Sequence, residues 1–465
     1  MFDTQTYQQR RAVLRQQMDQ GLLLFIGNEE SPMNYEHNTY PFRQDSSFLY
    51  YFGINVPSVA ALIDLEEGRE ILFGDEAGID DLVWTGRTET LRERALKGGI
   101  TDISPAADLP SFLQRARAQG RPIHFLPPYR AEHGVKLFRW LGIDPATAVE
   151  KASNAFIRAV VQQRAIKSAA EVEEIEKAVA ISAEMQLLAM RTARPGMSEA
   201  ELAAAVQQVA QRAGGNLAYP TILTVNGHIL HNHSRENRLQ EGQLVLNDCG
   251  AETPLGYCGD LTRTFPAGPR FTDRQKTLYE IVRKALDTAA GALKPGTPYL
   301  DIHFTACRTL AHGLKELGLM KGDVDEAVAA GAHALFFQCG TGHMMGMDVH
   351  DMENLGEQYV GYDETLQKEK SLFGLKSLRL GRKLQPGFVL TVEPGLYFNP
   401  FLIDLWKSEN KFAAFIDYQE VEAYRNFTGI RIEDNFLVTE AGAQLLGPPL
   451  PTTIEEVEET RSLAF

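Results

Sequence analysis

The sequence predicts two domains, and the first is an α/β domain with a central sheet. A chain of 465 residues is too long for one ordinary domain. Helical patterns alternate with short apolar runs through residues 1–150, which is typical of strands separated by helices. A new amphipathic pattern starts after Lys167-Ser168, where the serine fits a helix N-cap. We therefore expect one domain, with a linker helix, over residues 1–165 and a second over residues 166–465.

The elements of the first domain are short. A helix is expected over Gln8–Gln20, and the aromatic run Pro41–Gly53 is typical of core or interface packing. No phosphate-binding loop or catalytic cluster is present in this region. The apolar runs predict strands at Leu22–Ile26, Val59–Asp64, Glu70–Phe73 and Pro122–Leu126, and the amphipathic runs predict helices at Glu89–Gly98 and Leu109–Gln119.

The second domain mixes longer helices with strands. The sequence Ser198-Glu-Ala-Glu201 resembles a capping box at the start of a helix over Ser198–Ala213. Gly356–Gln385 is expected to be a loop. Other helices are predicted at Asn154–Arg191, Thr272–Leu293, Tyr299–Leu317 and Val324–Ala330, and other strands at Thr221–Val225, Phe388–Phe398 and Gly429–Glu440.

Two aspartates interrupt a predicted hairpin around which the second domain is organised. A turn at Pro254–Gly256 separates the strand-like runs Leu244–Gly250 and Tyr257–Phe265. Aspartate is depleted in strands, yet Asp248 and Asp260 lie in the middle of these runs. Folded together, the strands would point both carboxylates into one apolar space, where they repel each other unless a cation is present. The hairpin therefore indicates a metal site.

Three further candidate ligands lie in strand-like or glycine-rich settings. Glu393 ends an apolar run, because Pro394 after it cannot donate to a ladder. Glu433 shares a face of its predicted strand with Arg431, and His343 follows a glycine-rich turn that lets the backbone approach a bound group. Each has a simpler explanation when taken singly: a lone buried histidine is more often a satisfied core residue, and a lone glutamate after a strand is usually a loop residue.

Taken together, the five side chains favour hard, oxygen-binding metals. Four carboxylates and one imidazole, with no cysteine pair and no HExxH motif, argue against a thiolate zinc site. They are too many for one tetrahedral ion but suit two ions that share bridging carboxylates. The glycines of Gly340–Gly346 have the wrong spacing for a dinucleotide-binding loop.

Composition excludes several classes of partner. The net charge of −15 argues against a nucleic-acid ligand and offers no polybasic patch for a membrane surface. The N-terminus lacks the apolar core of a signal peptide, and no apolar run approaches the length of a membrane span. Four cysteines in so long a chain form no disulfide framework, so we expect them to be reduced and the protein to be cytoplasmic.

The five candidate ligands, in their order along the chain, resemble the ligand set of the pita-bread metallopeptidases. Within that family the proline-specific branch, aminopeptidase P and prolidase, is similar in the segments ILH (Ile229–His231), DxG…YxGDxTRTF, GxGHxxGMDVHD, TVEPG and GIRIED. The segment YPFRQDSSFLYYFG also resembles the start of bacterial aminopeptidase P. The resemblance implies a creatinase-like N-terminal α/β domain followed by an α+β pita-bread catalytic domain.

The resemblance also implies a role for each residue. Asp248 would chelate one metal ion, Asp260 and Glu433 would bridge both ions, and His343 and Glu393 would complete the second. Glu393 would in addition move a proton from the attacking water to the leaving nitrogen. His231 and His350 would steady the substrate and the tetrahedral intermediate, and Arg431 would hold a ligand carboxylate in place. Manganese is the family's usual metal, and cobalt and zinc are also compatible with these ligands.

Two features depart from the family pattern. Cys339 stands where the proline-specific branch commonly has a histidine, and we expect the thiol to line the substrate pocket without binding metal. The segment Asn399–Asn426 lengthens the connection between Glu393 and Glu433. Its aromatic residues are expected to pack at a subunit interface or over the mouth of the active site, the alternative being an added layer of core.

The leading hypothesis is an Xaa-Pro aminopeptidase, which removes an N-terminal residue from a penultimate proline. A prolidase, which cleaves only Xaa-Pro dipeptides, is the alternative within the same class. Two further hypotheses are a pita-bread binding module without catalysis and a creatinase-type amidinohydrolase, and two bound metal ions per chain would argue against both. The substrates would be proline-containing peptides, and family members often form homodimers or tetramers.

Overall fold

The chain folds into two compact units. The computed structural model describes residues 1–86 and 89–465. Within these residues, no helix combines the length and hydrophobicity that a membrane span requires. The first unit comprises Met1–Arg164 and Met352–Tyr359, and the second comprises Ala165–Asp351 and Val360–Phe465.

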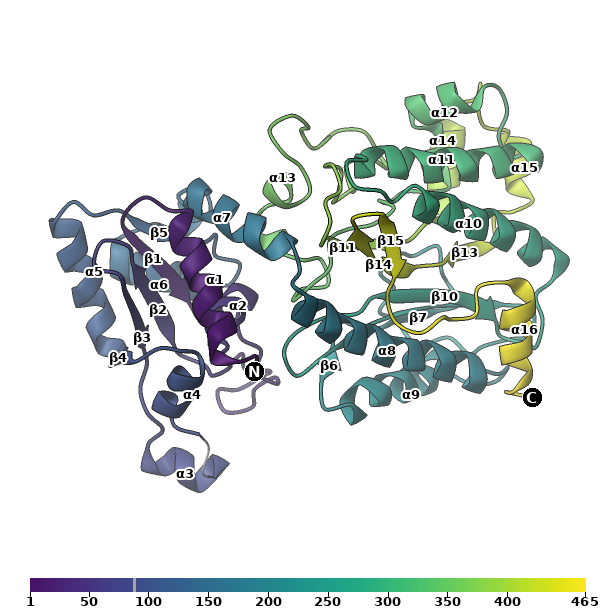
Figure 1. The fold of residues 1–465 in the computed structure, drawn as a ribbon. Coiled ribbons are helices and arrows are strands. Elements are labelled where there is room, and N and C mark those ends of the chain that lie inside the picture. Colours follow the sequence, from purple (N-terminus) through teal and green to yellow (C-terminus); the bar gives the residue numbers. More distant parts are fainter. Residues whose placement is uncertain (87–88) are drawn as a thin grey trace. The chain divides into compact units, whose positions relative to one another are not determined.

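The first unit is organised around a mixed sheet (Figure 1). Its strands are β1 (Leu22–Ile26), β2 (Ala60–Asp64), β3 (Arg69–Phe73), β4 (Asp102–Ser104) and β5 (Ile123–Phe125). They form one five-stranded sheet in the order β4-β3-β2-β1-β5. β2 is antiparallel to both of its neighbours, whereas β5 and β4 join the sheet in parallel. The four strands predicted in this region are confirmed within one or two residues at each end, and the short β4 was not predicted.

Seven α-helices of the described chain begin within the segment Met1–Arg164 of the first unit. They are α1 (Thr4–Gln16), α2 (Ser46–Phe52), α3 (Ile79–Thr85), α4 (Leu91–Lys97), α5 (Leu109–Ala118), α6 (Ala131–Leu141) and α7 (Asn154–Ala165). α1 starts four residues earlier than predicted, because the Asp3 side chain caps it by accepting from the backbone N–H of Thr6 at 2.7 Å. The aromatic run Pro41–Gly53, predicted to pack in a core or interface, contains α2. The ring of Phe52 on this helix lies 5.1 Å from that of Phe25 on β1.

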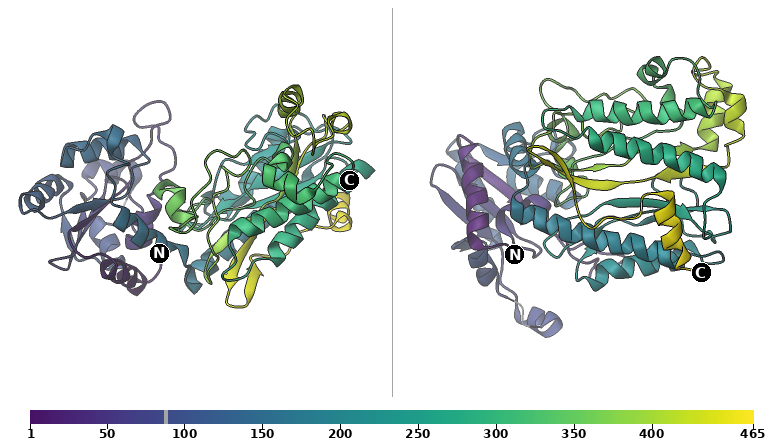
Figure 2. Two further views of the ribbon diagram at one scale, coloured as in Figure 1. Left: turned by 90° about the horizontal axis from the view of Figure 1, so that it is seen from above. Right: turned by 45° about the vertical axis from the view of Figure 1, so that its right-hand side comes forward.

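The second unit is built on two pairs of long helices. α8 (Ala169–Thr192) packs with α9 (Glu199–Arg212), and α10 (Asp273–Gly291) packs with α11 (Tyr299–Glu316) (Figure 2). The N-cap predicted at Ser168 and the capping box predicted at Ser198 are confirmed, and Ser168 also forms a capping box, with Glu171 as its second member. The predicted helix Asn154–Arg191 is therefore two helices, because the chain leaves helical geometry before the cap at Ser168.

Each of these helix pairs covers its own group of strands. α8 contacts β8 (Leu244–Cys249) and β10 (Leu261–Pro266), whereas α10 contacts β11 (Val389–Val392), β12 (Gly395–Phe398) and β13 (Thr428–Arg431). The remaining elements are β6 (Asn216–Leu217), β7 (Ile222–Thr224), β9 (Ala251–Glu252), α12 (Val324–Ala330), α13 (Glu357–Val360), α14 (Pro400–Ser408), α15 (Tyr418–Glu422), β14 (Asp434–Thr439), β15 (Gly442–Leu445) and α16 (Ile454–Ser462).

The strands form two main groups that meet along one seam. β8 lies between β10 and β7, and β14 lies between β11 and β15, while β12 pairs with β13. An isolated bridge between Thr262 and Glu433 joins the groups, with the backbone N–H of Glu433 donating to Thr262 O at 3.0 Å. Arg263 reinforces the seam by donating to the carbonyl oxygen of Glu433 at 2.8 Å and pairing with Asp434 at 2.7 Å.

The predicted strand Tyr257–Phe265 is wrong in its first half. β10 begins only at Leu261, so Asp260 lies just before the strand rather than in its middle. The residues ahead of it make other contacts: the backbone N–H of Gly259 donates to Ala251 O at 2.9 Å, and that of Thr253 donates to Tyr257 O at 2.8 Å. Asp248 does lie in β8 as predicted, directly opposite Thr262 of β10.

The predicted strands Phe388–Phe398 and Gly429–Glu440 are each broken in the middle. The first divides into β11 and β12 around Glu393-Pro394, because proline has no N–H to donate to a ladder. The second divides into β13 and β14 around Ile432-Glu433, where Glu433 bonds to Thr262 of another strand. A carboxylate therefore lies at each of the two breaks.

The aromatic insertion Asn399–Asn426 forms an added layer on the second unit. It carries α14 and α15, and the ring of Trp406, which is 3% exposed, lies 5.4 Å from that of Phe412. Tyr424 stacks on Phe398 of β12 at 5.7 Å. Phe401, at 82% exposed, is not buried in this layer. The packing matches the alternative interpretation of the insertion as extra core.

Candidate metal centre

A cavity of about 320 Å³ in the second unit contains every site residue predicted from the sequence. Tyr219, Leu230, Ser377 and Arg379 are among its other lining residues. The described residues of the insertion Asn399–Asn426 do not contribute to its wall. The predicted residues that it brings together are Asp248, Asp260, His343, Glu393, Glu433, His231, His350, Arg431 and Cys339.

The two aspartates lie side by side at one end of the paired strands β8 and β10. Asp248 is 7% exposed and Asp260 is 5% exposed. The hydroxyl of Tyr219 contacts one carboxylate oxygen of each, at 2.5 Å in the case of Asp248. Asn435 holds the backbone of Asp260, since its side chain accepts from the Asp260 N–H at 3.1 Å and donates to the Asp260 carbonyl oxygen at 2.5 Å. These contacts aim both carboxylates into the cavity.

The two glutamates enter the site from facing strand breaks. β11 pairs with β14 up to Val392 opposite Asp434, and β12 pairs with β13 from Gly395 opposite Arg431. Glu393 and Glu433 lie in the gap between these two ladders. Because the ladders on either side fix both chains, neither glutamate can move far from the other.

His343 reaches the carboxylates from a segment that runs beside β11. The backbone N–H of Thr391 donates to His343 O at 3.0 Å, and that of Glu393 donates to Thr341 O at 2.7 Å. Gly342 permits this approach, because a Cβ there would collide with the carbonyl oxygen of Thr391 and the hydroxyl of Tyr299. The ring Nδ1 lies 3.0 Å from Met344 O and donates to it, which leaves Nε2 free to accept.

The distances around His343 suit the ligands of one ion. Its Nε2 lies 3.2 Å from Asp260 Oδ2 and 3.7 Å from Glu393 Oε1. Ligands at right angles around an ion with bonds of about 2.1 Å lie about 3.0 Å apart. Ligand atoms of Asp260, His343 and Glu433 all lie within 4.8 Å of one another.

The carboxylates of the cavity are held at a considerable electrostatic cost. Burial, followed by the neighbouring carboxylates, raises the pKa of Glu433 well above its ordinary value. Burial likewise raises the pKa of Asp248, and it raises the pKa of Glu393 to about 7. Glu433 Oε2 accepts from the Thr262 hydroxyl at 2.7 Å, whereas its buried Oε1 has no partner among the described residues. An oxygen-rich set with an orphaned carboxylate oxygen fits divalent cations.

Arg431 supplies a fixed positive charge behind the ligands. It is 3% exposed, and its Nη2 lies 2.5 Å from Asp248 Oδ2. Its Nη1 donates to the Tyr397 hydroxyl at 3.0 Å, which holds the guanidinium in place. Arg379 also lines the cavity, but two guanidinium groups cannot balance four carboxylates, so Arg431 orients Asp248 without replacing a metal ion.

The remaining predicted residues form the wall of the cavity. The ring centroid of His350 lies 4.4 Å from that of His343. His231 lies in the segment after β7, and desolvation lowers the pKa of its ring below the ordinary value. Burial raises the pKa of the Cys339 thiol to about 12, so that it carries no charge at neutral pH.

Tyr219 and Asn435 contact the site but were not predicted. Tyr219 precedes β7, and the preceding sequence carries no motif that sets it apart. Asn435 is a residue of the strand β14, although asparagine is depleted in strands. That depletion, which drew attention to the aspartates, is the one signal that would have identified Asn435.

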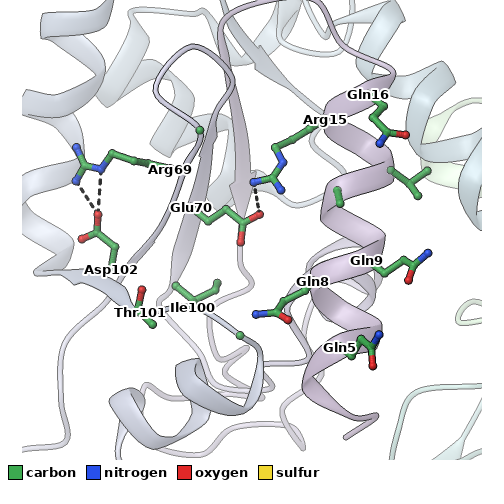
Figure 3. Close-up of a pocket in the computed structure, with 14 residues that line it drawn as sticks. Gln5, Gln8, Gln9, Arg15, Gln16, Arg69, Glu70, Ile100, Thr101 and Asp102 are labelled. Carbon is green, nitrogen blue, oxygen red and sulfur yellow. Dashed lines mark hydrogen bonds and ion pairs between the residues drawn. The ribbon is translucent and has the colours of Figure 1, made fainter.

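A second hollow lies on the first unit beside α1. Its lining includes Arg15, Arg69, Glu70 and Asp102 (Figure 3). Arg15 pairs with Glu70 at 2.9 Å, and Arg69 pairs with Asp102 at 2.6 Å. Because these charged groups already pair with one another, this hollow lacks the convergent unpaired ligands of the cavity in the second unit.

Comparison with known proteins gives consistent matches over nearly the whole chain. The model of metallopeptidase family M24 matches residues 173–440, and the model of the aminopeptidase P N-terminal domain matches residues 7–124. The chain is 31% identical to the Xaa-Pro aminopeptidase of Escherichia coli strain K12, over 98% of this chain and 97% of that protein. It is also 31% identical to the Xaa-Pro dipeptidase of Homo sapiens, over 94% of this chain and 88% of that protein.

Solved structures agree with these matches. Zinc-substituted E. coli aminopeptidase P in complex with product superposes with a TM-score of 0.81 at 30% identity, covering 100% of this chain and 99% of that one. Aminopeptidase PepP of Pseudomonas aeruginosa superposes with a TM-score of 0.80 at 29% identity, covering 99% and 98%. The predicted fold class, a creatinase-like α/β domain followed by an α+β pita-bread domain, is confirmed.

Removing the metal ions is expected to lower the melting temperature more at about pH 7 than at about pH 5. Burial raises the pKa of Glu393 from 4.5 to about 7, so between these values the metal-free folded state binds more protons than the unfolded state. Its free energy of unfolding therefore falls as the pH rises through this window. Bound cations offset the carboxylate charges and bind better as the ligands lose protons.

The measurement is differential scanning calorimetry of chelator-treated and metal-loaded protein at both pH values. A melting-temperature difference that stays constant across the window would contradict the assignment of these buried carboxylates as metal ligands.

Proposed function

The chain belongs to metallopeptidase family M24, and we propose that it is an Xaa-Pro aminopeptidase, a hydrolase that releases the residue preceding a penultimate proline. The observation that carries this proposal is the convergence of four carboxylates, four histidines and two arginines in a single cavity. The matched relatives are Xaa-Pro aminopeptidases and dipeptidases, and this chain spans almost the full length of the aminopeptidases.

We propose that the site holds two divalent cations. Asp248 would hold one ion, Asp260 and Glu433 would bridge the two, and His343 and Glu393 would complete the second. Mn²⁺ is our choice for the native metal, because the set is rich in hard oxygen ligands. Zn²⁺ is a second metal to test, since a related E. coli enzyme has been zinc-substituted. When bound, the ions supply Lewis acidity at the scissile carbonyl and lower the pKa of the attacking water.

Glu393 is the residue that we assign to proton transfer. It lies at the break between β11 and β12, beside His343, and lines the cavity. Its carboxylate would take the proton of the attacking water and pass it to the proline nitrogen as the peptide bond breaks. The paired ladders on either side would hold this group within reach of both atoms.

His231 and His350 are the proposed donors to the substrate. Both rings line the cavity, and His350 packs against the ligand His343. Imidazole N–H groups aimed at the scissile carbonyl would stabilise the charge that develops on its oxygen. Arg431 acts behind them as a positioning residue, through Asp248.

We also propose that the protein works in the cytoplasm as a homo-oligomer. All four cysteines are free, which suits a reducing compartment. The helix α3 exposes Ile79, Val83 and Trp84 by 77%, 74% and 85%, a larger apolar group than Phe401 and Leu405 of α14. An exposed apolar patch of this kind marks an interaction site, and a second copy of the chain is the partner that we propose.

Activity on proline peptides of two lengths tests the function. An aminopeptidase is expected to cleave both an Xaa-Pro dipeptide and a longer peptide with the same first two residues, releasing the first residue from each. A prolidase would cleave the dipeptide alone. The measurement uses Mn²⁺-loaded enzyme, and chromatography detects the free amino acid that it releases. An Xaa-Ala peptide is the control substrate. Cleavage of neither proline peptide would refute both readings.

Removing a bridging carboxylate is expected to remove both metal and activity. Asp260→Ala and Glu433→Ala should each lower kcat/KM by more than about 100-fold, beyond the 10–100-fold typical of residues behind a ligand. Elemental analysis should show fewer than two ions per chain in each variant. His343→Ala should behave alike.

Cys339→Ser is the matched control in the same cavity. It should retain both ions and lose less than about tenfold in activity, because a thiol is a poor ligand for a hard centre. Loss of an ion from Cys339→Ser, or full activity in Asp260→Ala, would contradict the ligand assignment.

Disrupting α3 is expected to lower the oligomeric state. The double variant Val83→Glu/Trp84→Glu places charge in the proposed contact and should sediment as a smaller species than the wild type. Phe401→Glu, at an equally exposed aromatic residue of the second unit, is the control and should leave the sedimentation coefficient unchanged. If Phe401→Glu dissociates the oligomer instead, the insertion Asn399–Asn426 and not α3 forms the interface.

A further inference from the structure

We propose that the second unit contains another metal site, built from His303, Cys307 and His333, which binds a thiophilic cation, Zn²⁺ or Cu⁺. These residues are not among those that line the catalytic cavity. They are 1%, 0% and 5% exposed, and one potential ligand atom from each lies within 4.8 Å of the other two.

The fold brings the three side chains together from two elements. His303 and Cys307 are four residues apart on α11, so they lie one above the other on one face of that helix. His333 lies in a short 3₁₀ helix, Ala332–Leu335, that follows α12 and packs against α11. The aromatic rings of Phe304 and Phe337 flank His303 at 5.5 and 5.9 Å.

The spacing matches two ligands of one tetrahedral ion. Cys307 Sγ lies 3.5 Å from His303 Nε2. Zinc bonds of about 2.3 Å to sulfur and about 2.0 Å to nitrogen place tetrahedral ligands about 3.5 Å apart. A cation could therefore enter between these atoms with little movement of α11.

The ring of His303 is oriented by a partner behind it. Its Nδ1 lies 2.8 Å from the Thr341 hydroxyl. In the tautomer that donates from Nδ1, Nε2 presents its lone pair to Cys307, which is how metal-binding histidines are usually held. Burial lowers the pKa of His303 to about 3 and that of His333 to about 4, so both rings are neutral and able to bind a cation.

A purely structural hydrogen bond is the competing explanation. The thiol of Cys307 could simply donate to His303 within a packed core. That arrangement leaves His333 Nδ1 buried with no partner among the described residues, although buried polar atoms are nearly always satisfied. A cation bound by both rings and the sulfur would account for His333 as well as for the other two.

The ligand set differs in kind from the catalytic one. Two imidazoles and one sulfur form a soft set, which favours Zn²⁺ or Cu⁺ over Mn²⁺. On binding, the Cys307 S–H bond breaks, the proton passes to solvent and the sulfur forms a bond to the cation. One thiolate leaves a single positive charge on a zinc site and none on a copper(I) site, so both cations must be tested.

Cobalt is the probe for the experiment, because a Co²⁺–thiolate bond gives a charge-transfer band in the near ultraviolet that carboxylate and imidazole ligands lack. Co²⁺ is titrated into the full-length, Mn²⁺-loaded enzyme. We expect the band to saturate at one Co²⁺ per chain and to disappear when Zn²⁺ is added. In a separate anaerobic arm, Cu⁺ is partitioned between the protein and a colorimetric chelator, and binding of one equivalent is the corresponding result.

Variants assign the band to its cysteine. Cys307→Ser should abolish the charge-transfer band, and His333→Gln should weaken Co²⁺ binding at least tenfold. The band should remain in two control variants, Cys258→Ser at another buried cysteine and Cys339→Ser in the catalytic cavity. Asp260→Ala should retain it too, which separates this site from the proposed function. X-ray absorption of Zn²⁺-loaded wild-type protein should show one sulfur at about 2.3 Å and depends on no variant.

Absence of the band and of Cu⁺ binding in the wild type would overturn the proposal. A band that persists in Cys307→Ser would do so as well, and so would X-ray absorption that shows no sulfur bound to the zinc.

Discussion

The mutual repulsion of four buried carboxylates is the constraint on which the second unit depends. Asp248, Asp260, Glu393 and Glu433 share one cavity, in which Arg431 forms an ion pair with Asp248. Two divalent cations would reverse this imbalance, but the carboxylates must be held together before the ions arrive. The seam between Thr262 and Glu433, the clamp of Asn435 on Asp260 and the hydroxyl of Tyr219 all do this with neutral hydrogen-bond donors.

The ligands could be predicted because burying a carboxylate in an apolar strand is unfavourable, so an acidic residue in a strand-like run is unusual and indicates a special role. Asp248 and Glu393 stand out in this way within a single segment of sequence. Tyr219 and Asn435 do not, because their roles arise from contacts between segments that lie far apart: Asn435 and Asp260 are 175 residues from each other. Pro394 indicated the strand break at Glu393, whereas the break at Glu433 was missed for a similar reason. The apolar pattern continues through Glu433, and the break there comes from its pairing with Thr262, which local periodicity cannot reveal.

One segment of the second unit runs between two groups of potential ligands of opposite chemistry. It begins at His333, among nitrogen and sulfur atoms, and reaches His343, among carboxylate oxygens. Thr341 touches both surroundings: its hydroxyl lies against His303, and its carbonyl oxygen accepts from the backbone of Glu393. The proposed site for soft cations and the proposed site for hard cations would thus lie at the two ends of one short segment. Hydrogen bonds hold the backbone of this segment.

The insertion Asn399–Asn426 leaves β12 and returns to β13 at the end of that ladder remote from Glu393 and Glu433. The register from Gly395 opposite Arg431 to Phe398 opposite Thr428 fixes the two glutamates whatever the length of chain beyond it. The insertion between β12 and β13 is therefore a suitable place to fuse a foreign segment. A peptide tag, a fluorescent domain or a loop from a homologue could be fused there, and the ladder would keep the metal ligands in register.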